Sequence, residues 1–118
     1  MTLPAMEPDC AAAVDALMDP AEAARLAGVA KALSDPVRLR VYAHIAASGP
    51  STVCACHLPG QLGITQPTLS HHLKKLVDVG LVGREYRGRW AHYSPRPEAL
   101  GELGRFLQQA GVMPTAAR

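Results

Sequence analysis

The stretch ITQPTLSHHLKKLVDVG, residues 64–80, decides the fold that this sequence predicts. Its long apolar side chains recur at spacings of three and four residues, which places them on one face of an α-helix. They are Leu69, Leu73, Leu76 and Val77. Thr65 is a good N-cap, Pro67 suits the first turn, and Gly80 suits the position just after the last turn. The stretch therefore predicts an amphipathic helix with a defined start and end.

The opposite face of this helix is polar and cationic, and it holds no acidic side chain before Asp78. Its members can donate or accept hydrogen bonds, or carry positive charge. They are Gln66, Thr68, Ser70, His71, Lys74 and Lys75. A helix that is anchored by its leucines can offer these groups to a polar target. The same pattern also fits a solvated surface helix, so the rest of the chain has to distinguish the two interpretations.

Length and composition predict a single folded domain. The chain has 118 residues, of which 48% are hydrophobic, so it is too short for two large cores and too apolar for a disordered chain. Residues 1–35 carry six acids and two bases, whereas residues 36–96 carry eight bases and two acids. Such a basic middle section suits a polyanionic partner.

The sequence favours a cytoplasmic location with no membrane partner. Its first residues, MTLPAMEPD, show neither the cationic start nor the apolar core of a signal peptide, and no apolar run approaches the length of a membrane span. The chain has three cysteines, Cys10, Cys54 and Cys56. An odd number in a chain without a signal predicts free thiols in a reducing compartment rather than a disulfide framework.

Further helices are expected before the opening stretch. Residues 20–33 predict one helix, and Asp35 is the expected N-cap of the next. Residues 54–62 predict a short helix, after which Gly63 turns the chain into the amphipathic helix. A short helix, a turn with glycine and a second, amphipathic helix are a helix-turn-helix signature.

A β-hairpin is expected after the amphipathic helix. The segment LVGREYRGRWAHYS, residues 81–94, predicts two short strands around a tight turn, for which Gly88 can supply a positive φ. A hairpin that follows a recognition helix is a wing. Arg84, Arg87 and Arg89 crowd its tip, where arginine typically contacts phosphate or a minor groove. We therefore expect Arg87 and Arg89 to contact DNA.

The predicted fold class is mainly α with a small β-hairpin wing, that is, a homodimeric winged helix-turn-helix. Residues 20–110 form the DNA-binding and dimerisation domain, between a flexible arm over residues 1–19 and a tail over residues 111–118. The helix predicted over residues 20–33 and a last helix over residues 98–110 each carry an apolar face. The core of so small a domain is not expected to need these two faces. These faces include Leu26, Val29, Leu100 and Leu103. Their burial between two subunits predicts a symmetric dimer, with recognition helices about 34 Å apart.

Cys54 and Cys56 lie where the short helix is expected to begin. Side chains two residues apart point to different sides of a regular helix, so two thiols converge only where the backbone enters it. Backbone amides at that place favour the thiolate, which is the form that binds soft metals. The pair is therefore a candidate chelate for a thiophilic ion, and two small buried cysteines are the alternative interpretation.

Two ligands rarely complete a metal site, and the candidates for a third are Cys10, on the arm, and His57. Three thiolates suit pyramidal As(III) or Sb(III), whose lone pair occupies the fourth direction. Addition of His57 suits tetrahedral Zn(II) or Cd(II) better.

Four segments stand in an order that is typical of one family: ALSDPVRLRV, TVCACHL, ITQPTLSHHLKKLVDVGLV and GRWAHY. They resemble the second-helix start, the metal-binding box, the recognition helix and the wing return of the ArsR/SmtB metal-sensing winged-helix repressors. The resemblance covers about residues 24–100. It implies a homodimer that represses a metal-detoxification operon and leaves its operator when an effector binds. It also assigns the thiols of the box to Cys54 and Cys56.

Two positions depart from the family pattern. His57 stands where the box usually has aspartate, and Pro59 stands where the arsenite-sensing branch often has a third cysteine. The resemblance implies that Cys10 can complete the triad, as N-terminal cysteines do in the cadmium/lead-sensing branch and in some arsenite sensors. His57 or an external thiol is the alternative third ligand. The last helix lacks the Asp and His of the zinc-sensing branch, so no zinc site is expected there.

We therefore predict a transcriptional repressor that binds double-stranded operator DNA as a dimer, needs no cofactor to do so, and is released by As(III) or Sb(III). A repressor of the same family that responds to Cd(II) or Pb(II) through Cys10, Cys54 and Cys56, with or without His57, is the first alternative. A thiol redox protein that uses Cys54 and Cys56 as an exchange pair is the second. The sequence lacks a cleft-forming sheet, a nucleotide loop and a base other than His57, so we do not expect an enzyme.

Overall fold

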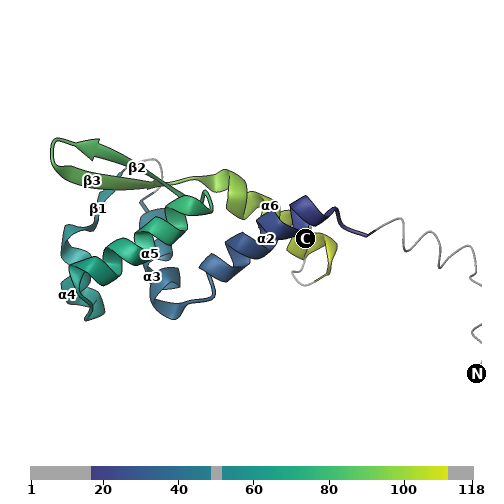
Figure 1. Ribbon diagram of the computed structural model, residues 1–118, viewed down its shortest axis with the longest axis horizontal. Helices are drawn as coiled ribbons and strands as arrows, with labels where there is room; N and C mark the ends of the chain where they lie inside the picture. Colours follow the sequence, from purple (N-terminus) through teal and green to yellow (C-terminus); the bar gives the residue numbers. More distant parts are fainter. Residues whose placement is uncertain (1–16, 49–51, 112–118) are drawn as a thin grey trace, which may run out of the picture.

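The computed structural model describes residues 17–48 and 52–111 of the chain. The described part is mainly helical, with one small antiparallel sheet (Figure 1), so the predicted architecture, mainly α with a small β-hairpin wing, is confirmed. Its elements are α2 (Pro20–Ala32), α3 (Pro36–Ala46), β1 (Val53–Cys54), the 3-10 turn η1 (Ala55–His57), α4 (Leu58–Leu62), α5 (Gln66–Asp78), β2 (Val82–Arg87), β3 (Trp90–Pro95) and α6 (Pro97–Gln109).

The helices begin and end at residues that suit those places. The Asp35 carboxylate accepts a hydrogen bond from the Arg38 backbone N–H at 3.0 Å, and so caps α3. The Thr65 hydroxyl oxygen accepts one from the Thr68 backbone N–H at 3.3 Å, and so caps α5. Gly63, with φ of 69°, turns the chain from α4 towards α5, and Gly80, with φ of 80°, follows the end of α5. The predicted start and end of α5 are thus confirmed.

The core lies between α3, α5 and the sheet. The apolar stripe of α5 lies inside it, since Leu69, Leu73 and Leu76 are almost completely buried. Val41 and Ile45 of α3 meet them there. Truncating one of these leucines to alanine would cost about 2–5 kcal/mol of stability, because burial is lost and a cavity is left. The core therefore fixes which face of α5 is exposed.

The sheet has three strands in the order β1-β3-β2. β2 and β3 form the predicted hairpin, in which Arg87 pairs with Trp90 and Gly88 turns with φ of 66°. The third strand was not predicted, and it changes the start of the expected helix over residues 54–62. Cys54 ends β1, residues 55–57 form the 3-10 turn, and α4 begins only at Leu58. Pairing with β3 is what holds this segment extended.

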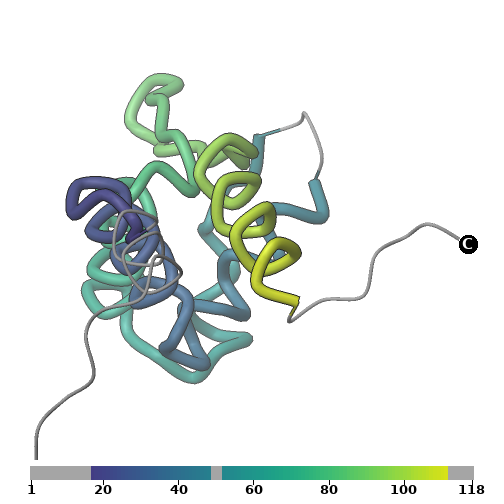
Figure 2. The backbone as a smooth tube through the Cα atoms, turned by 90° about the vertical axis from the view of Figure 1, so that its right-hand side faces the viewer, coloured from purple at the N-terminus to yellow at the C-terminus, as the bar shows by residue number. Residues whose placement is uncertain are grey.

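α2 and α6 pack against each other at the end of the molecule away from the wing (Figures 1 and 2). This contact corrects the expectation that the apolar faces of both helices have no use within one chain. Leu26 and Val29 are already buried in the single chain, at 7% and 5% exposure. α6 differs, because none of its residues is fully buried. The apolar side chains of α6 thus remain more accessible than Leu26 and Val29 of α2.

Parts of the predicted organisation lie outside the described residues. These are the arm over residues 1–16, with Cys10, and the tail over residues 112–118. Within the described ranges, no helix is long and apolar enough to cross a membrane.

Candidate nucleic-acid interface and thiol site

The polar face of α5 is exposed as the sequence predicts. Leucines on the opposite face anchor the helix in the core, so the side chains of this face point to solvent. The exposed members are Gln66, Thr68, Ser70, His71, Lys74 and Lys75. The Lys74 ammonium lies 2.9 Å from the Asp78 carboxylate, one turn along the helix. Exposed pairs of this kind contribute at most about 1 kcal/mol, so Lys74 can exchange Asp78 for another anion.

The wing carries both cations and aromatic rings. Arg87 and Arg89 are exposed, as predicted, and a guanidinium nitrogen of Arg87 lies 3.1 Å from a Glu85 carboxylate oxygen. Tyr86 and Trp90 are exposed at 65% and 58%. The sequence analysis assigned no role to Tyr86 or Trp90. The hairpin register places Tyr86 opposite Ala91 and Trp90 opposite Arg87, so the two rings lie on opposite faces of the hairpin. Alternation along the two strands is the signal from which these faces could have been predicted.

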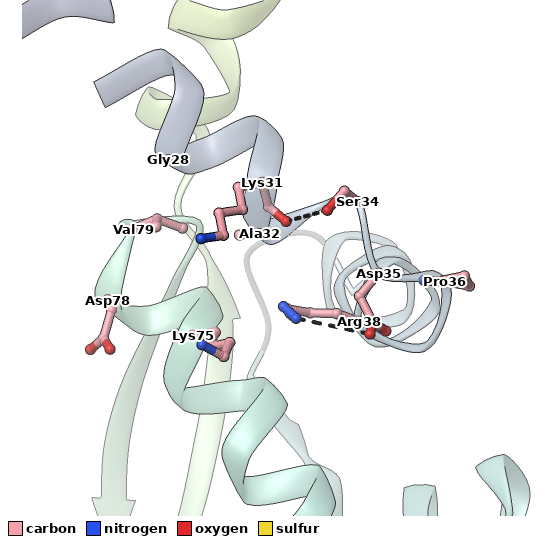
Figure 3. A pocket seen from close by; sticks show the side chains of 10 residues that line it. All are labelled: Gly28, Lys31, Ala32, Ser34, Asp35, Pro36, Arg38, Lys75, Asp78 and Val79. Carbon is pink, nitrogen blue, oxygen red and sulfur yellow. Dashed lines mark hydrogen bonds and ion pairs between the residues drawn. The ribbon is translucent and has the colours of Figure 1, made fainter. Parts of the chain in front are cut away.

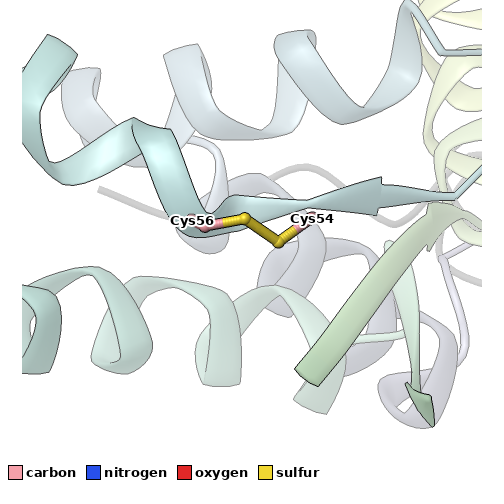
Figure 4. The surroundings of a disulfide bond; sticks show 2 residues. All are labelled: Cys54 and Cys56. Atoms are coloured by element: carbon pink, nitrogen blue, oxygen red, sulfur yellow. A yellow bond between two sulfur atoms is a disulfide. The ribbon is translucent and has the colours of Figure 1, made fainter. Parts of the chain in front are cut away.

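Cys54 and Cys56 form a disulfide (Figure 4), with their Cα atoms 5.4 Å apart. The prediction of free thiols for this pair is therefore wrong for the structure. The physical reason is the backbone, which leaves β1 at Cys54 and enters the 3-10 turn at Ala55. There the two side chains converge, as expected for thiols at the point where the chain enters a helical turn. Reduction of the bond would leave two sulfurs able to bind one atom together.

One hollow of about 680 Å³ joins the thiol pair to α5 and the wing. Cys54 and Cys56 line it together with Gln66 and Ser70 of α5. The wing supplies the remaining wall, which includes Arg84, Tyr86, Arg89, Trp90 and Tyr93. The structure thus brings the candidate effector thiols next to two of the candidate DNA-reading side chains.

The third ligand is not found in the described residues. No group of three His, Cys, Asp or Glu side chains in residues 17–48 and 52–111 is placed to hold a metal ion, so His57 does not join the two cysteines there. His92 stands opposite Cys54 in the β1–β3 register, and its buried Nδ1 has no hydrogen-bond partner in that part of the chain. The sequence did not indicate that His92 lies beside Cys54, because a two-residue strand has no periodicity that reveals its partner.

A second hollow, of about 520 Å³, lies between α2, α3 and the C-terminal part of α5 (Figure 3). Lys75 lines it, and not the hollow beside the thiols, so the structure separates Lys75 from Ser70. Arg38 is nine-tenths buried at its wall, with a guanidinium nitrogen 4.0 Å from the Asp35 carboxylate. The hydrogen bond from the Arg38 backbone N–H holds the pKa of Asp35 below 3.8, although burial partly opposes that shift. Asp35 therefore stays ionised at neutral pH.

Comparison with known proteins gives the family. A model of a helix-turn-helix domain family matches residues 33–84. An arsenical resistance operon repressor of Staphylococcus xylosus is 37% identical over 82 residues, which are 70% of this chain and 76% of the relative. One of Bacillus subtilis is 36% identical over 73 residues, which are 62% of this chain and 68% of the relative. An ArsR-like transcriptional regulator from Rhodococcus sp. RHA1 shares the structure with a TM-score of 0.64 and 28% identity, over 78% of this chain and 84% of that one.

The fold and its exposed polar helix define a winged helix-turn-helix regulator of transcription. The chain belongs to the ArsR family of these regulators, so the family predicted from the four sequence segments is confirmed. The members of this family bind DNA and repress transcription. The prediction that the chain is not an enzyme is confirmed by that membership.

Proposed function

We propose that this chain represses transcription as a dimer on operator DNA and that As(III) or Sb(III), bound by Cys54 and Cys56, releases it. The hollow that these cysteines share with Gln66 and Ser70 carries the proposal. An effector that is bound by sulfur at this place lies against the helix that is expected to read DNA. Relatives with the name arsenical resistance operon repressor support an arsenic-type effector.

α5 would read the operator from the major groove. Its exposed side chains can hydrogen bond base edges, where a bidentate contact gives about 1–3 kcal/mol of discrimination between bases. These side chains are Gln66, Thr68, Ser70 and His71. The cations Lys74, Lys75, Arg87 and Arg89 would contact phosphate, which adds affinity without a base code. Surface ion pairs such as Arg87–Glu85 are weak enough to open for that contact.

The effector step requires the reduced pair. A disulfide offers no thiolate, so a cellular thiol reductant has to open the Cys54–Cys56 bond before an ion can bind. Two thiolates then hold As(III) from one side. A third sulfur completes the pyramid, from Cys10 or from an external thiol.

The charge of the hollow favours As(III) or Sb(III) over Cd(II) or Pb(II). Arg84 and Arg89 line it, and none of the described residues that line it is a carboxylate. A divalent cation would approach two guanidinium groups there, and only the two thiolates would compensate its charge. Arsenous and antimonous acids are neutral in water near pH 7, so they enter without that repulsion. A repressor that responds to Cd(II) or Pb(II) is therefore the alternative function, favoured less than one that responds to As(III) or Sb(III).

Effector binding would act through the short distance from the thiols to α5. Only η1, α4 and residues 63–65 separate Cys54 from the start of α5, and both elements line the shared hollow. An effector shifts an equilibrium only by its differential affinity for the two states. A coupling of about 1–3 kcal/mol would lower operator affinity roughly 5–150-fold.

α6 would provide most of the dimer interface, with α2 beside it. In the single chain its apolar side chains Leu100, Leu103 and Leu107 are only partly buried, and Phe106 is 38% exposed. In a dimer with two-fold symmetry, the α6 face of each subunit would be buried against the α6 face of the other. Such a dimer would present both α5 helices to a palindromic operator with half-sites about 34 Å apart.

A displacement titration tests the proposal. The reduced chain is bound to a DNA duplex that it has selected from a random library, and arsenite, antimonite, Cd(II) and Pb(II) are then added separately. Release at lower concentrations of arsenite or antimonite is expected. Release by Cd(II) or Pb(II) alone would support the alternative effector. Retention of DNA with all four ions would contradict the effector role and leave the repressor role standing.

A further inference from the structure

The hollow between α2, α3 and the C-terminal part of α5 is lined by cationic side chains from all three helices. Among the described residues these are Lys31, Arg38 and Lys75. Figure 3 shows the Arg38 guanidinium pointing from α3 towards α5, and the Lys31 ammonium pointing from α2 towards the same helix. Like charges that surround one hollow repel each other, and an anion between them would relieve that repulsion.

The carboxylates that line this hollow in the described part of the chain, Asp35 and Asp78, do not neutralise the three cations. A guanidinium nitrogen of Arg38 lies 4.0 Å from the Asp35 carboxylate, which is the outer limit of an ion pair. The Asp78 carboxylate is turned away from Arg38 in Figure 3, and it lies 2.9 Å from the ammonium of Lys74, which does not line the hollow. The hollow therefore keeps an excess of positive charge.

Arg38 carries a buried hydrogen-bond donor that lacks an acceptor. The residue is nine-tenths buried, and its buried Nε has no hydrogen-bond partner in the described part of the chain. A buried donor without an acceptor costs stability, so an acceptor that enters the hollow would recover that cost. The planar guanidinium presents paired N–H groups whose spacing matches two oxygens of a phosphate group. The chemistry of Arg38 thus indicates an oxyanion as the missing partner.

We propose that this hollow is a phosphate-binding site. Arg38 donates hydrogen bonds to the phosphate oxygens from the wall, and the exposed Lys31 and Lys75 supply positive charge at the opening. The hollow shares no lining residue with the one beside Cys54 and Cys56, so the site is separate from the thiols. The phosphate group belongs either to the DNA backbone or to a free phosphate compound. The part that concerns DNA rests on the proposed function.

The position and the size of the hollow suit both sources of phosphate. Lys75 lies one helical turn after His71, which is expected to read DNA, so the hollow opens at the edge of the DNA-reading face of α5. A recognition helix in a major groove has a phosphate backbone along each of its two sides. The volume of about 520 Å³ is also large enough for a small phosphorylated molecule.

Nuclear magnetic resonance of the reduced full chain without DNA tests the site. Inorganic phosphate is added at constant ionic strength, with chloride as the comparison anion, and the Arg38 Nε–H signal is followed because this nitrogen lacks a partner. Arg38→Lys keeps the charge, removes the guanidinium and so identifies the signal. Arg40, an exposed arginine of α3 outside the hollow, gives the control signal, and Arg40→Gln is the control for Lys31→Gln. The salt dependence of operator affinity is measured for the same variants.

Phosphate should shift the Arg38 signal and not that of Arg40, and Lys31→Gln should weaken this binding up to about fivefold. A salt slope that Lys31→Gln flattens by about 0.9, and Arg40→Gln does not, would assign the phosphate to DNA. An unchanged slope with a shifted Arg38 signal would assign it to a free phosphate compound. An unchanged slope with no shift of Arg38 beyond that of Arg40 would overturn the site, while operator binding keeps the proposed function. If the chain binds no operator, the proposed function fails, and a shift of the Arg38 signal still supports the site.

Discussion

Ser70 of α5 and Cys56 of the thiol pair line one hollow, although they belong to different elements. α5 positions Ser70 because its leucines are anchored in the core, and the end of β1 positions Cys56 because pairing with β3 holds that strand. In the proposed function, a change at the thiols would therefore reach Gln66 and Ser70 of α5 directly across this hollow. Testable consequences follow for DNA binding, assembly, stability and sensing.

Ser70→Ala and His71→Ala should each weaken operator binding with the fold intact. Both side chains are exposed and neither belongs to the core, so stability should change little. Loss of a base contact of about 1–3 kcal/mol corresponds to roughly 5–150-fold in affinity. Fluorescence anisotropy with the selected duplex measures it, and Gln108→Ala, on the exposed side of α6, serves as the control. Wild-type affinity in both variants would show that this face does not read DNA.

Arg87 and Arg89 should add affinity without sequence preference. Replacing both with alanine should flatten the plot of log affinity against log salt by about 1.8, because each phosphate contact contributes about 0.9 to the slope. Binding to operator and to random DNA should weaken alike. Arg105→Ala, an exposed arginine of α6, should leave the slope as it is. An unaltered slope in the double variant would place the wing away from DNA.

Leu103→Glu should yield monomers with much weaker operator binding. Leu103 is half-buried on α6, and a carboxylate there would not tolerate burial against a second subunit. Sedimentation at micromolar concentration measures the assembly. Because Leu103 also packs on the core, Phe106→Glu, at a more exposed position, should give the same result without unfolding. A monomeric wild-type protein would contradict the palindromic arrangement.

His72 should make stability fall as the pH drops below neutrality. Burial lowers its pKa below 6.5, and the Asp35 carboxylate only partly opposes that shift. The unfolded chain therefore binds the proton more tightly, so the free energy of unfolding is highest above pH 6.5 and declines as the pH falls through that value. Urea unfolding of the wild type and of His72→Gln at several pH values measures this. A decline of the same size in both proteins would assign it to other groups.

The sequence predicts the parts of this structure that local chemistry determines. Thr65 and Gly80 mark the ends of α5, and its leucine stripe marks the buried face, because capping and helical periodicity are local. β1 was missed because Val53 and Cys54 form a strand only by pairing with Tyr93 and His92, far along the chain. The same non-local pairing and the turn after it bring Cys54 to Cys56, which the cysteine count could not indicate.

The candidate site was likewise predictable only where its residues follow from a local sequence pattern. The polar residues of α5 follow from its periodicity, since each helical position has a known face. The wing residues of the shared hollow do not, because Tyr86 and Trp90 line it with the thiols only after the hairpin folds beside β1. The prediction that the apolar faces of α2 and α6 have no use within one chain was wrong for a related reason. Leu26 and Val29 are buried by contacts within the chain that a pattern along one helix cannot reveal.

In the proposed function, Cys54 and Cys56 sense the effector and are not needed to bind DNA. Arsenite displacement from the selected operator duplex, measured side by side for the reduced wild type, Cys54→Ser and Cys56→Ser, tests it most directly. Both variants should bind the operator with an affinity close to wild type, and arsenite should not release them at concentrations that release the wild type. Loss of operator binding in the arsenite-free variants, or release at wild-type concentrations, would contradict it.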